Sequence, residues 1–179
     1  MSRDNDVSHL HPAFVAPLLK LEEALQAEDI PLALYEGARS PFRQAELYAR
    51  GRGVGEPGKF ATHAKAWGSF HQHGLAADFV FLVNGQWTWG EPRPGLWKRY
   101  AELARAAGLR CLDFERPHCE LPVALQPLQV GHYPAGGSDG WRAWLEDQIE
   151  QWGQEARVIG GITHPAAPPL NFDRPTLAA

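Results

Sequence analysis

Asp78 lies in an almost wholly apolar stretch, Leu75 to Val83, which reads LAADFVFLV. This stretch predicts a central strand in which Asp78 shares one face with Ala76 and Val80. A carboxylate there is at least partly buried, and burial without a partner is costly, so a cation or strong donors must lie beside it. A salt bridge to an arginine or a backbone cap would serve as well as a metal ion, and for a lone buried aspartate that arrangement is the commoner one.

Two histidines precede this aspartate. His71 lies seven positions before Asp78, just ahead of Gly74, where the chain can turn into the strand. An imidazole from a loop and a carboxylate from a strand can then converge on one ion, and this nitrogen and oxygen donor set suits zinc. His73 competes with His71, because residues two apart in an extended segment point the same way. The spacing alone leaves that choice open.

A third group of candidate residues is Glu115-Arg116-Pro117-His118, which follows a predicted strand over residues 109–114. His118 would complete a site of three ligands. Glu115, three positions earlier, could then act as a general base toward a water on the metal. The Glu-x-x-His pattern is weak by itself. Its value comes from following a strand and from the independent pair of His71 and Asp78.

The elements that must position these residues are mixed in type. Apolar periodicity and turn residues predict helices over residues 12–28, 41–51, 94–107 and 138–152. Strands are predicted over residues 30–36, 75–83, 86–89 and 109–114, and a long glycine-rich loop over 51–68. Helices and strands do not alternate regularly, so we expect an α+β fold with a small antiparallel sheet flanked by helices.

Length and charge limit the classes of function. The 179 residues suit one domain, expected over residues 1–153, with a proline-rich tail over 154–179. A formal net charge of -4 offers no basic field for nucleic acid. No signal-peptide pattern and no membrane-spanning stretch is found, so we expect a protein made in the cytoplasm without insertion into a membrane. Cys111 and Cys119 are expected to be reduced thiols, and Cys119 to pack rather than bind metal.

The motifs together resemble a known family. The string S-x-H-x-x-G-x-A-x-D over residues 69–78, followed by E-x-P-H over 115–118, is similar to the signature of the D-Ala-D-Ala carboxypeptidase and L-alanyl-D-glutamate endopeptidase family. These zinc cell-wall peptidases share a fold with lysostaphin-type enzymes and the hedgehog signalling domain. The resemblance includes residues 36–40 and 44–52, covers about 12–122, and leaves 123–153 as a helical extension.

The resemblance implies a role for each motif residue. His71, Asp78 and His118 would bind one Zn²⁺ ion, Glu115 would be the general base, and Arg39 would polarise the scissile carbonyl. A guanidinium at a strand end suits that last role, although a surface salt bridge explains Arg39 equally well from the sequence.

Three further residues are candidates for substrate binding. Ser69 either supports the ligand loop or contacts substrate. His73 occupies a variable position of the motif and is either a substrate contact or an ordinary loop histidine. Trp67 lies in the long loop beside the motif and is expected to line the cleft.

The implied function is hydrolysis of peptide bonds in peptidoglycan stem peptides, most similar to L-alanyl-D-glutamate endopeptidases, including phage endolysins. The alternatives are a D-Ala-D-Ala carboxypeptidase or dipeptidase, and a non-catalytic zinc-binding module. We expect a monomer whose partner is the wall peptide, reached after release by a holin or a dedicated secretion system. Action on wall fragments inside the cytoplasm is the other possibility.

Overall fold

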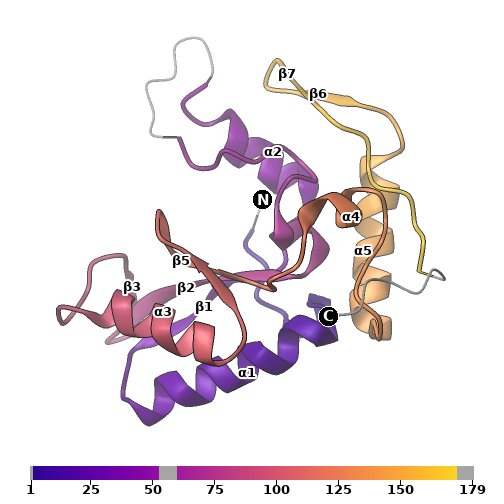
Figure 1. Ribbon diagram of the computed structural model, residues 1–179. Coiled ribbons are helices and arrows are strands. Elements are labelled where there is room, and N and C mark those ends of the chain that lie inside the picture. Colours follow the sequence, from indigo (N-terminus) through magenta and orange to yellow (C-terminus); the bar gives the residue numbers. More distant parts are fainter. Residues whose placement is uncertain (1, 53–59, 173–179) are drawn as a thin grey trace.

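The computed structural model describes residues 2–52 and 60–172, and its centre is an antiparallel sheet (Figure 1). The strand order is β1-β2-β5-β4, and β3 pairs with β2 beyond that path. The strands are β1 (Leu32–Glu36), β2 (Ala76–Val83), β3 (Gln86–Thr88), β4 (Arg110–Leu112) and β5 (Glu115–Glu120). The expected α+β class with a small antiparallel sheet is confirmed.

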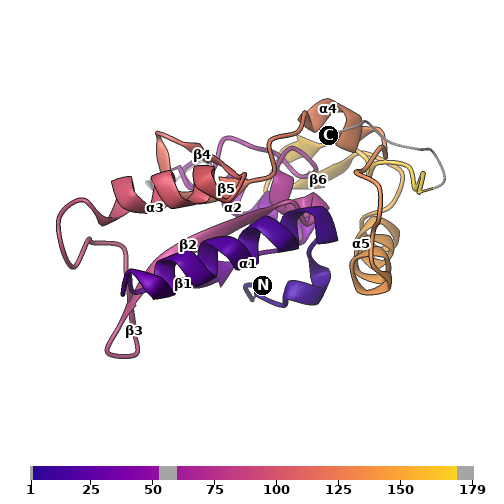
Figure 2. The same ribbon diagram turned by 60° about the horizontal axis from the view of Figure 1, so that its bottom comes forward.

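Helices α1 (Pro12–Ala27) and α3 (Leu96–Ala106) pack together beside this sheet (Figure 2). The alternation in β2 turns Phe79 and Phe81 toward α3. There Phe79 packs against Tyr100 and Phe81 against Trp97, with ring centroids 5.7 and 4.7 Å apart. Asp78 points to the opposite face, which leaves that face of β2 available for a polar site.

The remaining helices lie around the other end of the sheet. They are α2 (Pro41–Ala49), α4 (Leu125–Gln129), α5 (Asp139–Trp152) and two short 3-10 helices, η1 (Val7–His9) and η2 (Phe70–His73). The helices expected over 12–28, 41–51, 94–107 and 138–152 are present within a few residues, whereas α4 and the 3-10 helices were not expected. Within the described residues, no helix combines the length and apolarity needed to cross a bilayer.

One strand prediction is wrong at its end. The sequence suggested a strand over 109–114 with Glu115 to His118 following it, but β4 ends at Leu112 and Glu115 begins β5. Pro117 is tolerated inside β5 because pairing with β4 shifts there: Leu112 faces Glu115, and the next partner along β5 is Cys119. Pairing with β2 reaches only as far as His118, so the missing N–H of Pro117 costs no ladder bond.

The described part of the predicted tail contains a second, two-stranded sheet, β6 (Arg157–Ile159) with β7 (Ile162–His164). His164 is fully buried, and its Nδ1 accepts a hydrogen bond of 3.2 Å from the amide of Ala66. The Trp152 indole donates to the Pro165 carbonyl. Residues 154–172 therefore pack against the rest of the chain, and the domain limit at 153 stays a prediction. Residues 53–59 of the predicted loop and 173–179 of the predicted tail lie outside the described residues.

Candidate metal centre

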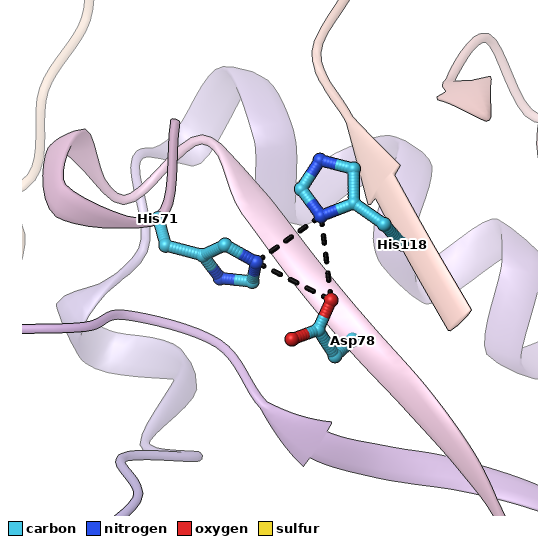
Figure 3. Close-up of side chains that lie close together, drawn as sticks. All are labelled: His71, Asp78 and His118. Atoms are coloured by element: carbon cyan, nitrogen blue, oxygen red, sulfur yellow. Dashed lines mark hydrogen bonds and ion pairs between the residues drawn. The ribbon is translucent and has the colours of Figure 1, made fainter. Parts of the chain in front are cut away.

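Three side chains from three separate elements converge on one point (Figure 3). His71 comes from η2, Asp78 from β2 and His118 from β5. Asp78 faces His118 across the β2–β5 pair, so their side chains leave the same face of the sheet. Gly74, at φ 69°, turns the chain from η2 toward β2 and brings His71 over that face.

The donor atoms of these side chains form a nearly equilateral triangle. His71 Nε2 lies 3.2 Å from His118 Nδ1, and each of these nitrogens lies 3.3 Å from Asp78 Oδ1. Four ligands placed tetrahedrally about 2.0–2.1 Å from zinc are about 3.3 Å from one another. The observed spacing therefore fits three corners of a zinc tetrahedron, with the fourth left for another ligand.

The outer hydrogen bonds of the two histidines fix which nitrogen carries the proton. His71 Nδ1 lies 2.6 Å from the carbonyl oxygen of Gly37, and His118 Nε2 lies 2.9 Å from Glu120 Oε2. Because carbonyl and carboxylate oxygens only accept, each of these nitrogens donates a proton, and the inner nitrogens present lone pairs. Two lone pairs and a carboxylate oxygen thus face one another, an arrangement that calls for a cation.

The charges around the centre favour an ionised carboxylate. Burial raises the pKa of Asp78, but His71, His118 and Arg39 together hold it well below its usual range. Burial lowers the pKa of His118, but hydrogen bonds with Asp78 and Glu120 raise it to about 9. The cluster therefore attracts positive charge, and a proton competes with a metal ion for it.

Arg39 holds the other oxygen of Asp78. Its Nη2 lies 2.8 Å from Asp78 Oδ2 and 2.7 Å from Glu36 Oε2, and its Nη1 donates to Gln44 Oε1. Only 7% of Arg39 is exposed, and Glu36 faces Asp78 across β1 and β2. The two explanations considered for Asp78 are thus compatible, because one oxygen faces the histidines while the other forms the salt bridge.

Glu115 stands at the start of β5, exposed to solvent and close to the same charges. Burial opposes the charge of Arg39, but neighbouring carboxylates, Glu115 among them, raise its pKa. Glu115 is also one of the charges that act on His118. It therefore lies beside the metal centre, on the solvent side.

Two pockets adjoin the centre, and both are lined by Arg39 and Glu115. The first, about 570 Å³, also contains Arg43, Arg50 and Arg116, and we call it the arginine pocket. The second, about 480 Å³, is lined largely by residues 60–64 and 68–71, and we call it the loop pocket.

Comparison with known proteins identifies the family. The chain is 31% identical over 126 residues to the peptidoglycan L-alanyl-D-glutamate endopeptidase CwlK of Bacillus subtilis (strain 168), a match that covers 64% of this chain and 74% of that protein. The chain belongs to this endopeptidase family. The relationship that the motifs indicated is confirmed, although no protein-family model matches the chain.

Solved structures similar to this family member include two kinds of peptidase. The L-Ala D-Glu endopeptidase ChiX of Serratia marcescens has a TM-score of 0.45 and 21% identity, covering 65% of this chain and 83% of that one. The LD-carboxypeptidase LdcB has a TM-score of 0.46 and 18% identity, covering 82% and 69%. The L,D-carboxypeptidase DacB from Streptococcus pneumonia has a TM-score of 0.42 and 19% identity, covering 88% and 79%.

Of the residues expected to contact substrate in this family member, Ser69 lines the loop pocket. Its backbone amide donates a hydrogen bond of 3.1 Å to Gln72 Oε1, which closes the η2 turn. Trp67 and His73, in contrast, are 1% and 0% exposed, and their rings pack 5.9 Å apart. Both side chains are therefore enclosed in the core, and a contact of Trp67 or His73 with substrate stays a prediction.

The same geometry separates the two competing histidines. His71 and His73 would point the same way in an extended segment, but they lie in a 3-10 helix, where three residues complete a turn. His71 consequently faces Asp78, while His73 Nδ1 faces the Tyr133 hydroxyl at 3.4 Å.

Sequence reasoning missed Glu36 and Glu120, which hold Arg39 and His118. For Glu120 a signal was present, because it lies two positions after His118 and residues two apart in a strand share a face. For Glu36 the partner becomes visible only through the pairing of β1 with β2.

Proposed function

We propose that this chain is a zinc-dependent peptidase that cuts the L-alanyl–D-glutamate bond of peptidoglycan stem peptides. The observation that carries the proposal is the triangle of lone pairs from His71, Asp78 and His118, spaced 3.2–3.3 Å apart beside two open pockets. Membership of the endopeptidase family supports the choice of bond, since the related CwlK protein is described as acting on it.

The residues of the chain divide the work of hydrolysis. His71 Nε2, Asp78 Oδ1 and His118 Nδ1 would hold the zinc, which supplies a Lewis acid for the carbonyl and lowers the pKa of water toward neutrality. Glu115 takes a proton from the attacking water and returns it to the leaving amine.

Arg39 acts mainly through Asp78. Its two terminal nitrogens already bond to carboxylate or amide oxygens, so it fixes the Asp78 carboxylate with Oδ1 turned toward the histidines. Its positive charge at the edge of both pockets also favours negative charge that develops on the substrate carbonyl.

Digestion of purified peptidoglycan, followed by mass spectrometry, tests the bond. New fragments with an N-terminal D-glutamyl residue are expected. Released D-alanine would indicate a carboxypeptidase instead, and intact peptidoglycan with zinc bound would indicate a non-catalytic module.

Glu115→Gln tests the assigned chemistry. We expect this variant to keep stoichiometric zinc and to lose at least about 100-fold in rate, because a carboxamide cannot accept the proton. Glu23→Gln on the exposed side of α1 is a matched control and should cleave at the wild-type rate. Equal rates for the Glu115 variant and the control would show that Glu115 is not the general base.

A further inference from the structure

The two pockets meet at the metal centre, and a substrate that spans the centre must occupy both. Arg39 and Glu115 line both pockets, while Asp78 lines only the arginine pocket and the two metal-facing histidines, His71 and His118, line only the loop pocket. The two sides of the cut bond therefore lie in different surroundings. The charges of the two pockets determine the direction in which the substrate binds.

The arginine pocket carries more positive than negative charge. The described residues of its lining include four arginines and three carboxylates. Glu36 pairs with Arg39 and Arg43, and the second oxygen of Asp78 pairs with Arg39. Within the part of the chain that the structure describes, no carboxylate forms a salt bridge with Arg50 or Arg116, and both are exposed.

The loop pocket, in contrast, has no excess of arginines over carboxylates in its described lining. Among the described residues that line it, Arg39, which it shares, is the only arginine, and the carboxylates are Glu115 and Glu120. Much of the remaining lining is neutral, and it includes Phe60, which is 59% exposed, and Phe114, which both pockets share. The described lining of this pocket thus holds no unpaired guanidinium for an anionic group.

A D-glutamyl residue on the amine side of the cut bond brings a negative charge with it. It has two carboxyl groups, and only one can continue the peptide, so the other stays free within one residue of the cut bond. A guanidinium binds such a carboxylate through two parallel charge-assisted hydrogen bonds. Arg116 is well placed for this, because it follows Glu115 directly, and Arg50, just after α2, lines the same pocket.

We infer that the arginine pocket receives the amine side of the cut bond, with Arg116 and Arg50 binding the free carboxylate of the D-glutamyl residue. The inference rests on the proposed function. The L-alanyl side and whatever is attached to it then occupy the loop pocket, against Ser69 and the exposed aromatic ring of Phe60. Arg116 and Arg50 thereby determine specificity without taking part in the chemical step.

Two synthetic substrates test this direction. They share one muramyl peptide sequence and differ only in the free group of the D-glutamyl residue, a carboxylate in one and a primary amide in the other. We expect wild-type protein to prefer the carboxylate by about tenfold or more in kcat/KM, the size of one charge-assisted hydrogen bond. The double variant Arg50→Gln/Arg116→Gln should cleave both substrates with equal kcat/KM. Its kcat/KM should fall only on the carboxylate substrate, mainly through a higher KM.

Arg93→Gln is the matched control, because it removes an exposed arginine outside both pockets and should keep the preference. Zinc content and melting temperature show that the variants remain folded. Equal cleavage of both substrates by wild type, or an equal loss on both in the double variant, overturns the inference and leaves the proposed function intact. Cleavage of neither substrate by wild type overturns the proposed function, and the inference with it.

Discussion

Glu120 Oε2 lies 2.9 Å from His118 Nε2, on the side of the ring that faces away from Asp78. The carboxylate makes this nitrogen the protonated one and turns the other toward the metal centre. Glu120 is 5% exposed, and its second oxygen lies 2.7 Å from Arg110 Nε. The orientation of the Glu120 carboxylate is therefore fixed by one partner on each oxygen, His118 and Arg110.

Glu120→Gln should weaken zinc binding by about 10- to 100-fold, because a neutral carboxamide supports the His118 ring less firmly than a carboxylate does. Competition with a chromophoric chelator measures the change. Arg110→Gln is the companion variant, since it removes the outer partner of Glu120 and leaves the histidine contact in place. Equal affinities for wild type and Glu120→Gln would show that this contact does not tune the site.

Arg39→Gln should lower the free energy of unfolding by about 3 kcal/mol or more, because it leaves the buried carboxylates of Glu36 and Asp78 without their shared cation. Urea unfolding with a chelator present measures this loss apart from any effect on zinc. Arg50→Gln, at an exposed position, should change the stability by less than about 0.5 kcal/mol. Similar values for the two variants would contradict the role given to Arg39.

Removal of metal should lower the melting temperature, and added zinc should restore it in proportion to the logarithm of its concentration. Saturation at about 1,000 times the dissociation constant corresponds to about 4 kcal/mol. Differential scanning calorimetry measures the shift. His118→Ala lacks one of the converging donors, so its melting temperature should respond far less to zinc. The same response in both proteins would place the zinc elsewhere.

Stability should fall in mild acid because His11 is fully buried. Burial lowers its pKa to about 4, against the hydrogen bond that it makes with the Pro134 carbonyl. An unfolded chain binds the proton near pH 6.5, so the stabilisation is present above that pH and is lost as the pH falls toward 4.

Between pH 7 and pH 5 this one group accounts for about 2 kcal/mol. His11→Gln should therefore show a flatter dependence of unfolding free energy on pH over this interval, measured by urea titrations at each pH. All other titrating groups are common to both proteins and cancel in the comparison. Parallel curves would show that His11 is not the neutral buried group described above.

Much of the centre could be found from the sequence, because its strand has a strong apolar pattern. Asp78 interrupts a run of core residues, and Phe79 and Phe81 in that run pack against α3. His71 and His118 then follow from motif spacing. The register between β2 and β5 brings Asp78 opposite His118. It cannot be predicted from the sequence of either segment alone.

What was missed depends on contacts between distant residues or on weak local signals. The enclosure of His73 arises from packing against residues such as Tyr133, sixty positions later. The β6–β7 hairpin has only three residues in each strand, and neither has a clear apolar alternation. Its Gly160-Gly161 turn was the one available sign, and the neighbouring prolines obscured it.

The hydrogen bond from Ala66 to His164 joins residues 98 positions apart, and Lys65 Nζ donates to the Thr163 carbonyl over the same separation. These bonds fasten the loop that leads into His71 to the β7 strand. During synthesis on a ribosome, this loop leaves the exit tunnel long before β7 does. A nascent chain thus carries His71 on a loop whose partner strand has not yet been made, and these two hydrogen bonds can form only after β7 has left the tunnel.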